Sequence, residues 1–123
     1  MDNVSFMKKD NIVKEKSYAF AVRIVRLYKF LCEEKKEYTL SKQLLRCGTS
    51  IGAMIRESEH AESNADFVHK LSISLKEANE TEYWLNLLKD TGYINKEMFN
   101  SISKDQEEII KLLTSIIKTC KAK

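Results

Sequence analysis

The scarcity of helix-breaking residues limits the possible folds of this 123-residue chain more than any other feature of its sequence. The chain has no proline and three glycines, Gly48, Gly52 and Gly92. Folds built from strands and tight turns depend on these two residue types to reverse the chain. The sequence therefore predicts an all-α protein whose long helices are joined by short loops.

Apolar side chains recur at helical spacing in four segments, so each segment would bury one face. The expected helices cover about residues 11–36, 40–61, 65–91 and 96–118. Short connections force neighbouring helices to run antiparallel. We therefore expect residues 1–123 to form one domain, an up-and-down antiparallel four-helix bundle.

Polar residues stand where three of these helices would begin. Thr39 or Ser41 is expected to cap the second helix, and Asn95 the fourth. Ser63 and Asp66 have the spacing of a capping box at the start of the third helix, with Asp in place of Glu.

The glycines have separate interpretations. Gly48 and Gly52 lie four residues apart inside the second expected helix, where each costs about 1 kcal/mol relative to alanine. Such a cost is typical of a site where a neighbouring helix approaches closely. Gly92 suits the left-handed conformation that ends many helices, so we expect the third helix to stop there.

The first and third helices are apolar on more than one face, although a lone bundle needs one apolar stripe per helix. Scattered apolar residues are common on protein surfaces, which is one interpretation of the surplus. We favour self-association, because aromatic and aliphatic residues occur together. The residues expected at the oligomer interface are Tyr18, Val22, Val25, Phe30, Ile73 and Trp84.

Polar residues flank the apolar stripes of the second and third helices, and some carboxylates there would be partly buried. A buried carboxylate needs a partner, which Arg46 or Arg56 could supply. One interpretation is a polar binding site. We favour an ion-pair network that fixes helix register or subunit contacts. Its expected members are Arg46, Ser50, Glu57, Ser74, Glu77 and Glu80.

Features that would indicate catalysis or a metal are weak. The pairs Glu57/His60 and Asp66/His69 have the Glu-x-x-His type of spacing found in di-iron bundles, but both flank one turn and would point away from the core. The chain has no nucleophile elbow or phosphate loop, and only two histidines for acid–base chemistry. We therefore expect no enzymatic activity, no metal and no cofactor.

The cysteines and the apolar runs bear on the expected location of the protein. Cys32, Cys47 and Cys120 fit neither a zinc spacing nor a disulfide framework, so we expect buried thiols in a reducing compartment. No segment approaches the roughly 20 apolar residues of a membrane span, and the N-terminus does not resemble a signal peptide. The sequence predicts a cytoplasmic protein with no membrane partner.

Basic residues suggest a binding activity. Arg23, Arg26 and Lys29 step along one flank of the first helix, and Arg56 is a further candidate for contact with phosphates. Lysines near the ends of this helix and in the fourth helix extend the charge: Lys14, Lys16, Lys35, Lys36, Lys111, Lys118, Lys121 and Lys123. At a net charge of +3, an ordinary solvated helix face is the alternative.

Two stretches carry a resemblance to a known family. Residues 44–57, LLRCGTSIGAMIRE, and residues 67–82, FVHKLSISLKEANETE, resemble the signature of the four-helix-bundle proteins encoded in intervening sequences of bacterial 23S ribosomal RNA genes. The resemblance covers about residues 14–118. Met54 stands where the family usually has Asn. The family's polar positions are matched by Arg46, Ser50, Glu57, Ser74 and Glu77.

The resemblance implies more than the fold. Similar family members form homopentamers around a central axis, which implies a ring-like homo-oligomer. The family also includes the accessory proteins of diversity-generating retroelements, basic pentamers that bind a reverse transcriptase and nucleic acid. We therefore expect a non-enzymatic binding module that contacts RNA or a ribonucleoprotein partner through basic helix faces. A protein-only scaffold or adaptor is the alternative.

Overall fold

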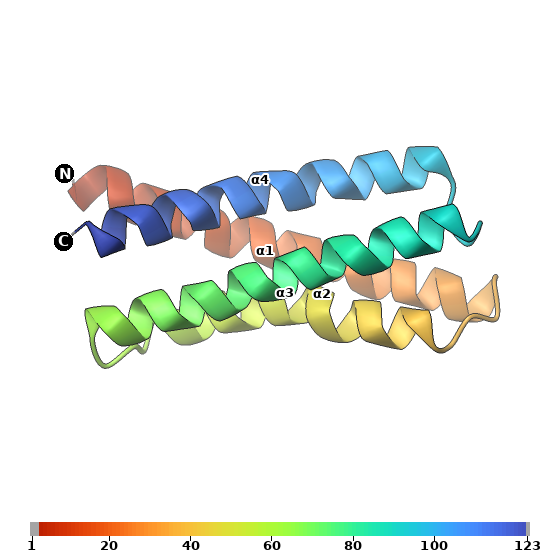
Figure 1. The fold of residues 1–123 in the computed structure, drawn as a ribbon, viewed down its shortest axis with the longest axis horizontal. Helices are drawn as coiled ribbons and strands as arrows, with labels where there is room; N and C mark the ends of the chain where they lie inside the picture. Colours follow the sequence, from red (N-terminus) through yellow and green to blue (C-terminus); the bar gives the residue numbers. More distant parts are fainter. Residues whose placement is uncertain (1–2, 123) are drawn as a thin grey trace.

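The computed structural model describes residues 3–122 of the chain, with side chains from Lys8 onward. These residues form four helices and no strand. The helices are α1 (Asn3–Glu33), α2 (Leu40–Ser58), α3 (Asn64–Asp90) and α4 (Lys96–Lys121). Successive helices run in opposite directions, and the beginning of α1 lies at the same end of the bundle as the end of α4 (Figure 1).

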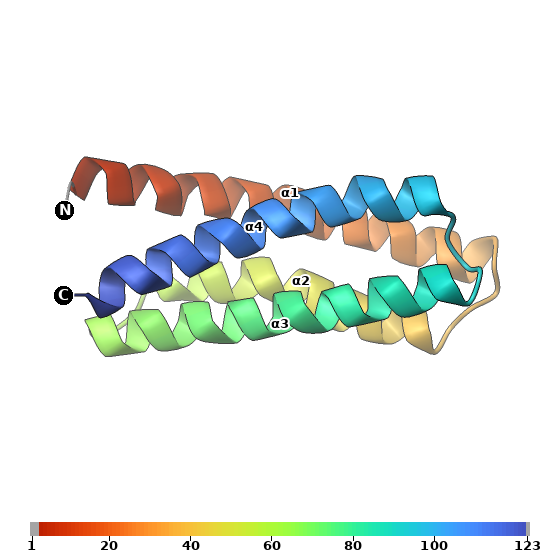
Figure 2. The same cartoon turned by 45° about the horizontal axis from the view of Figure 1, so that its top comes forward.

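Each helix packs against two neighbours. α1 and α3 both contact α2 and α4, while the diagonal pairs do not meet within the described residues (Figure 2). This arrangement is the up-and-down four-helix bundle that the apolar periodicity and short connections predicted. It leaves every helix with one inner face, two flanks against neighbours and one outer face.

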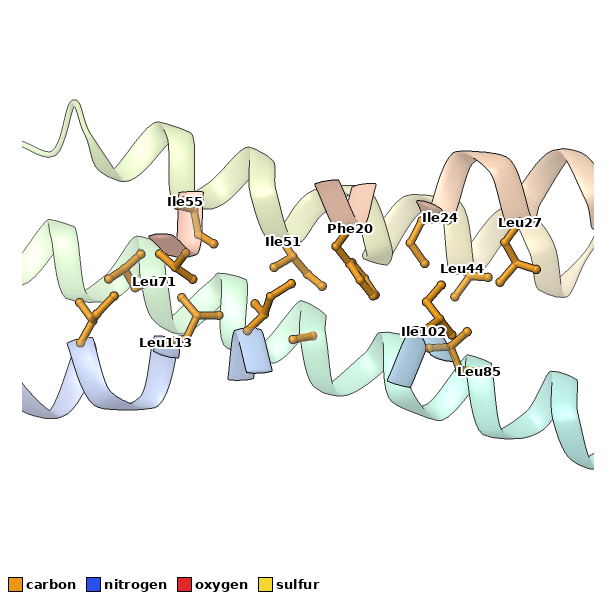
Figure 3. Packing of buried hydrophobic residues seen from close by; sticks show 14 of the residues in the cluster. Phe20, Ile24, Leu27, Leu44, Ile51, Ile55, Leu71, Leu85, Ile102 and Leu113 are labelled. Carbon is orange, nitrogen blue, oxygen red and sulfur yellow. The ribbon is translucent and has the colours of Figure 1, made fainter. Parts of the chain in front are cut away.

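The inner faces meet in one continuous core along the bundle axis (Figure 3). Burying one such aliphatic or aromatic side chain contributes about 1.5–3 kcal/mol. The stripes predicted from periodicity supply most of the fully buried large side chains. The largest are Phe20, Ile24, Leu31, Leu44, Ile51, Ile55, Leu71, Leu85, Leu88, Ile109, Leu113 and Ile116.

The ends of α1 and α2 differ from the sequence prediction. α1 ends at Glu33 rather than at Lys36, because Lys36 adopts a left-handed conformation with a φ of 54°. The amide of Glu37 then donates to the carbonyl of Leu31 at 3.0 Å and closes the helix end. α2 ends at Ser58 rather than at residue 61, because the next three amides bond three residues back instead of four.

The outer ends of α1 and α4 are longer than predicted. α1 begins at Asn3 instead of residue 11, and α4 continues to Lys121 instead of residue 118. Contacts between helices hold these additional turns. Lys9 Nζ donates to Ser115 Oγ at 2.9 Å, and Asn64 Nδ2 donates to the carbonyl of Cys120 at 3.3 Å.

Two predicted caps are confirmed. Ser63 Oγ accepts from the amide of Asp66 at 3.0 Å, and Asn95 Oδ1 accepts from the amide of Met98 at 2.8 Å. The Asp66 carboxylate returns to the amide of Glu62 at 3.2 Å, one residue before the cap. The capping box is therefore present in a form shifted by one residue.

The predicted cap of α2 is wrong. The Thr39 side chain makes no capping hydrogen bond, and the Ser41 hydroxyl donates to the Glu37 carbonyl. The Glu37 carboxylate instead accepts the amides of Thr39, Leu40 and Ser41 at 3.2, 3.1 and 2.8 Å. Burial raises the pKa of Glu37, but these amides outweigh burial, so the pKa lies below its ordinary value of 4.5.

The glycines of α2 allow a close approach of α1, as predicted. A Cβ at Gly48 would lie 2.8 Å from Ile24 Cγ1, and one at Gly52 would lie 3.2 Å from the Ser17 carbonyl oxygen. The second contact is with backbone, which cannot turn aside as a side chain can. Gly92 has a φ of 84° just after α3, which confirms the left-handed helix end.

We predict that Glu37→Ala lowers the free energy of unfolding by about 1–2 kcal/mol, because the first amides of α2 lose their acceptor. Since the pKa of Glu37 is lower in the folded protein, its contribution is complete above the unfolded pKa and is lost as pH falls through the folded pKa. Urea unfolding of both proteins across acidic pH measures this. The two stabilities should converge at low pH, and a constant gap would contradict the assignment.

We predict that Gly52→Leu lowers the free energy of unfolding by about 1–3 kcal/mol, because the new side chain meets the Ser17 carbonyl. Thermal unfolding followed by circular dichroism measures the change. Ala53→Leu is the matched control, since Ala53 is the next residue and is exposed. Equal melting temperatures for the two variants would show that the α1–α2 contact is not a steric limit.

Candidate nucleic-acid interface and polar network

Arg23 is a bracing residue between helices rather than a free member of the predicted basic stripe. Its Nη1 pairs with Asp105 Oδ2 at 2.5 Å and donates to the Ser101 carbonyl at 3.2 Å. Its Nη2 donates to the Ser101 hydroxyl at 2.8 Å. These bonds tie α1 to α4 and occupy much of the guanidinium.

The other three predicted phosphate-binding residues lie apart. Arg26 and Lys29 are exposed on α1, and neither has a hydrogen bond or ion pair within residues 8–122. Arg56 projects from α2 at a different seam, where it lines a surface hollow with Lys14 and Tyr18. The structure therefore does not bring Arg56 together with Arg26 and Lys29.

The outer face of α4 carries a basic stripe that the sequence analysis recognised only in part. Lys104, Lys111 and Lys118 are exposed and seven residues apart, so they lie on one face at steps of about 10 Å. Lys96 and Lys121 are exposed near its ends. None of the five has an ion pair among the described residues. The seven-residue spacing is the signal that could have identified the whole stripe.

Arg46 joins α2 to α3 through the predicted ion-pair network. Its Nη1 lies 3.3 Å from Glu77 Oε2, and its Nη2 pairs with Glu80 Oε2. The same Glu80 oxygen accepts from Trp84 Nε1 at 3.0 Å. Arg46 is half exposed, so this network contributes about 1 kcal/mol at most and serves mainly to fix register.

The remaining polar residues of the predicted set do not join this network. Ser74 is buried and donates to the Ile51 carbonyl at 2.8 Å, which links α3 to α2 through the core. Ser50 donates to the Arg46 carbonyl within α2 at 2.6 Å. Glu57 is exposed and lies 4.0 Å from Lys70 Nζ. The six residues therefore do not form one polar site.

The residues predicted for an oligomer interface divide among three places. Tyr18, Val22 and Val25 share the outer face of α1, where Tyr18 is 63% and Val25 37% exposed. Phe30 lies on the flank of α1 that faces α4. Ile73 and Trp84 are half-buried on α3, and Trp84 packs edge-on against Tyr83 with ring centroids 5.1 Å apart.

The titratable groups of the described residues form no cluster of three metal-binding side chains. His60 and His69 are exposed, and Asp66 is engaged in capping. The pKa of Asp10 is raised, mainly by burial and then by the negative charge of Glu59. The positive charge of Lys14 acts in the opposite direction but does not cancel the rise.

Cys32, Cys47 and Cys120 form no disulfide among the described residues. Cys47 and Cys120 are buried, as predicted, whereas Cys32 is half-buried. Burial raises the pKa of the Cys47 thiol, which keeps it protonated and weakly reactive. No helix in the described part of the chain combines the length and the apolar character needed to cross a membrane.

These features define a four-helix-bundle protein in which arginine ion pairs link α1 to α4 and α2 to α3, and in which exposed lysines lie on the outer face of α4. The chain belongs to the family of 23S rRNA-intervening sequence proteins, whose model matches residues 9–115. The resemblance found in residues 44–57 and 67–82 is thereby confirmed.

A solved structure supports the same assignment. The chain is similar to a protein of unknown function of the S23 ribosomal protein family from Bacteroides thetaiotaomicron VPI-5482. The two are 66% identical, and the alignment covers 89% of this chain and 98% of that chain with a TM-score of 0.89. No protein with a curated description matches the chain.

Proposed function

We propose that this protein is a non-catalytic, homo-oligomeric binding module that contacts RNA, alone or in a ribonucleoprotein, through the outer face of α4. The observation that carries the proposal is the stripe of Lys104, Lys111 and Lys118, none of which makes an ion pair among the described residues. The family's name connects such proteins with ribosomal RNA genes, and this connection favours RNA among the polyanions.

The electrostatics of the stripe suit a phosphate backbone. Lysines that are not neutralised by nearby carboxylates release counterions from a nucleic acid when they bind it, and this release drives association. Elsewhere, Lys14, Lys16 and Arg46 are neutralised by Glu59, Glu108 and the α3 carboxylates. Arg26 and Lys29 of α1 remain as additional phosphate contacts.

The outer face of α1 supports self-association. Tyr18, Val22 and Val25 recur there at helical spacing, with Tyr18 and Val25 exposed and Val22 half-buried. An exposed aromatic and aliphatic stripe of this kind is typical of an interface between copies. A ring-like assembly, pentameric as the family resemblance implies, would repeat the α4 face once in each copy.

We predict that Lys104→Gln with Lys111→Gln weakens RNA binding and lowers the log–log salt slope by about 2 units, because two phosphate contacts are lost. Glutamine avoids adding a carboxylate beside Glu107 and Glu108. A salt series with a labelled structured RNA, followed by fluorescence anisotropy, gives both quantities. The control is Lys42→Gln with Lys76→Gln, which removes the same charge from exposed sites on α2 and α3.

Equal losses in the two double variants would contradict the assignment to α4. Absence of RNA binding by the unaltered protein near 50 mM salt, a permissive condition, would overturn the RNA proposal altogether. The second candidate function, a protein-only scaffold, would then remain, and the exposed apolar stripe on α1 is the observation that favours it.

We predict that Tyr18→Lys with Val25→Lys reduces the mass of the assembly, because it places charges in the proposed apolar interface. Light scattering coupled to gel filtration measures the mass. Tyr83→Lys is the matched control, since Tyr83 on α3 is 61% exposed and Tyr18 is 63% exposed. A monomeric unaltered protein, or equal dissociation of the control, would contradict this interface.

A further inference from the structure

A groove of about 520 Å³ lies between the second half of α1 and the first turns of α4. Leu27 and Ile102 form its floor, since they are 9% and 3% exposed. Phe30 and Met98 are half-buried at its sides. This volume lies in the range of pockets that bind ligands or partner side chains, about 300–1,000 Å³.

The edge of this groove carries more unpaired cations than carboxylates. Arg26 lines it and Lys35 lies over the Phe30 ring, and neither makes an ion pair among the described residues. Asp105 offsets the charge of Arg23, and Glu97 is the one carboxylate in the lining. A partner that carries carboxylates beside apolar side chains therefore complements both the charge at the edge and the apolar floor.

The groove is poorly suited to nucleic-acid bases. Single-stranded nucleic acids bind mainly by stacking bases on aromatic rings. Phe30 is the one aromatic residue in the lining, so the groove offers a single ring on which a base could stack. The aliphatic floor and Met98 instead offer contacts to apolar side chains, and methionine adapts to different shapes.

We propose that this groove binds an acidic amphipathic helix of a partner protein. Apolar side chains one helical turn apart would enter between Phe30 and Met98, as in other helix-in-groove complexes. Carboxylates on the flanks of that helix would meet Arg26 and the unused donors of Arg23. The site is separate from the lysine stripe on the outer face of α4.

The test uses a labelled helical peptide with Leu and Phe along one face and Glu elsewhere. A second peptide has the same composition, but its apolar residues are scattered around the helix. Fluorescence anisotropy with the full chain should show binding of the first peptide and much weaker binding of the second. Equal affinity for the two peptides would overturn the proposal, because only charge would then be recognised.

Two variants locate the binding site. Arg26→Glu should weaken binding of the amphipathic peptide roughly tenfold, because it replaces attraction by repulsion at the edge of the groove. Lys29→Glu is the matched control, an exposed cation of the same helix that does not line the groove. Equal effects of the two substitutions would overturn the assignment.

Met98→Glu should abolish binding of the amphipathic peptide while leaving the assembly mass unchanged. Circular dichroism shows whether this variant remains folded, and Arg26→Glu keeps the proposal testable if it does not. A fall in assembly mass in Met98→Glu would identify the groove as a contact between copies of the chain and overturn the proposal of a partner helix.

Discussion

The close approach of α1 and α2 is the constraint on which the rest of the bundle depends. Gly52 lies against the backbone of Ser17, and Gly48 leaves only enough room for Ile24. Each helix contacts just two neighbours within the described residues. The distance between α1 and α2 therefore limits where α3 and α4 can pack against them. Tyr18 and Val25 lie on the opposite side of α1 from the buried Phe20 and Ile24, so they remain on the outer surface whatever the width of the seam.

Arginines and lysines have different places in this fold. Arg23 braces α1 to α4, and Arg46 braces α2 to α3, each with more than one hydrogen-bonding contact. The planar guanidinium suits such branched contacts, whereas lysine behaves as a mobile point charge. Lys104, Lys111 and Lys118 of α4 make no ion pair among the described residues, and neither do Arg26 and Lys29 of α1. The unpaired charge that a partner can reach therefore lies on both helices.

The fold could be predicted because its information is local. Apolar spacing identified the core faces, and Ser63 and Asn95 identified two helix starts. The misassigned features depend on relations that local patterns do not contain. Arg23 meets Asp105, 82 residues away, and nothing near Arg23 indicates that partner. Glu37 caps α2 because Lys36 turns the chain through a left-handed conformation, which is uncommon for lysine. The candidate site depends on such distant pairings and was predicted less completely than the core.

The separation of the surfaces has a consequence for affinity. A stripe of a few lysines on one copy binds a phosphate backbone weakly at physiological salt. If copies associate through the outer face of α1, the α4 stripes are held at a fixed spacing, and every contact after the first becomes intramolecular. Weak individual stripes then suffice for stable binding of a long RNA, while a short RNA that reaches one stripe dissociates rapidly. Selection by length and shape, rather than by base sequence, is the specificity that this arrangement supports.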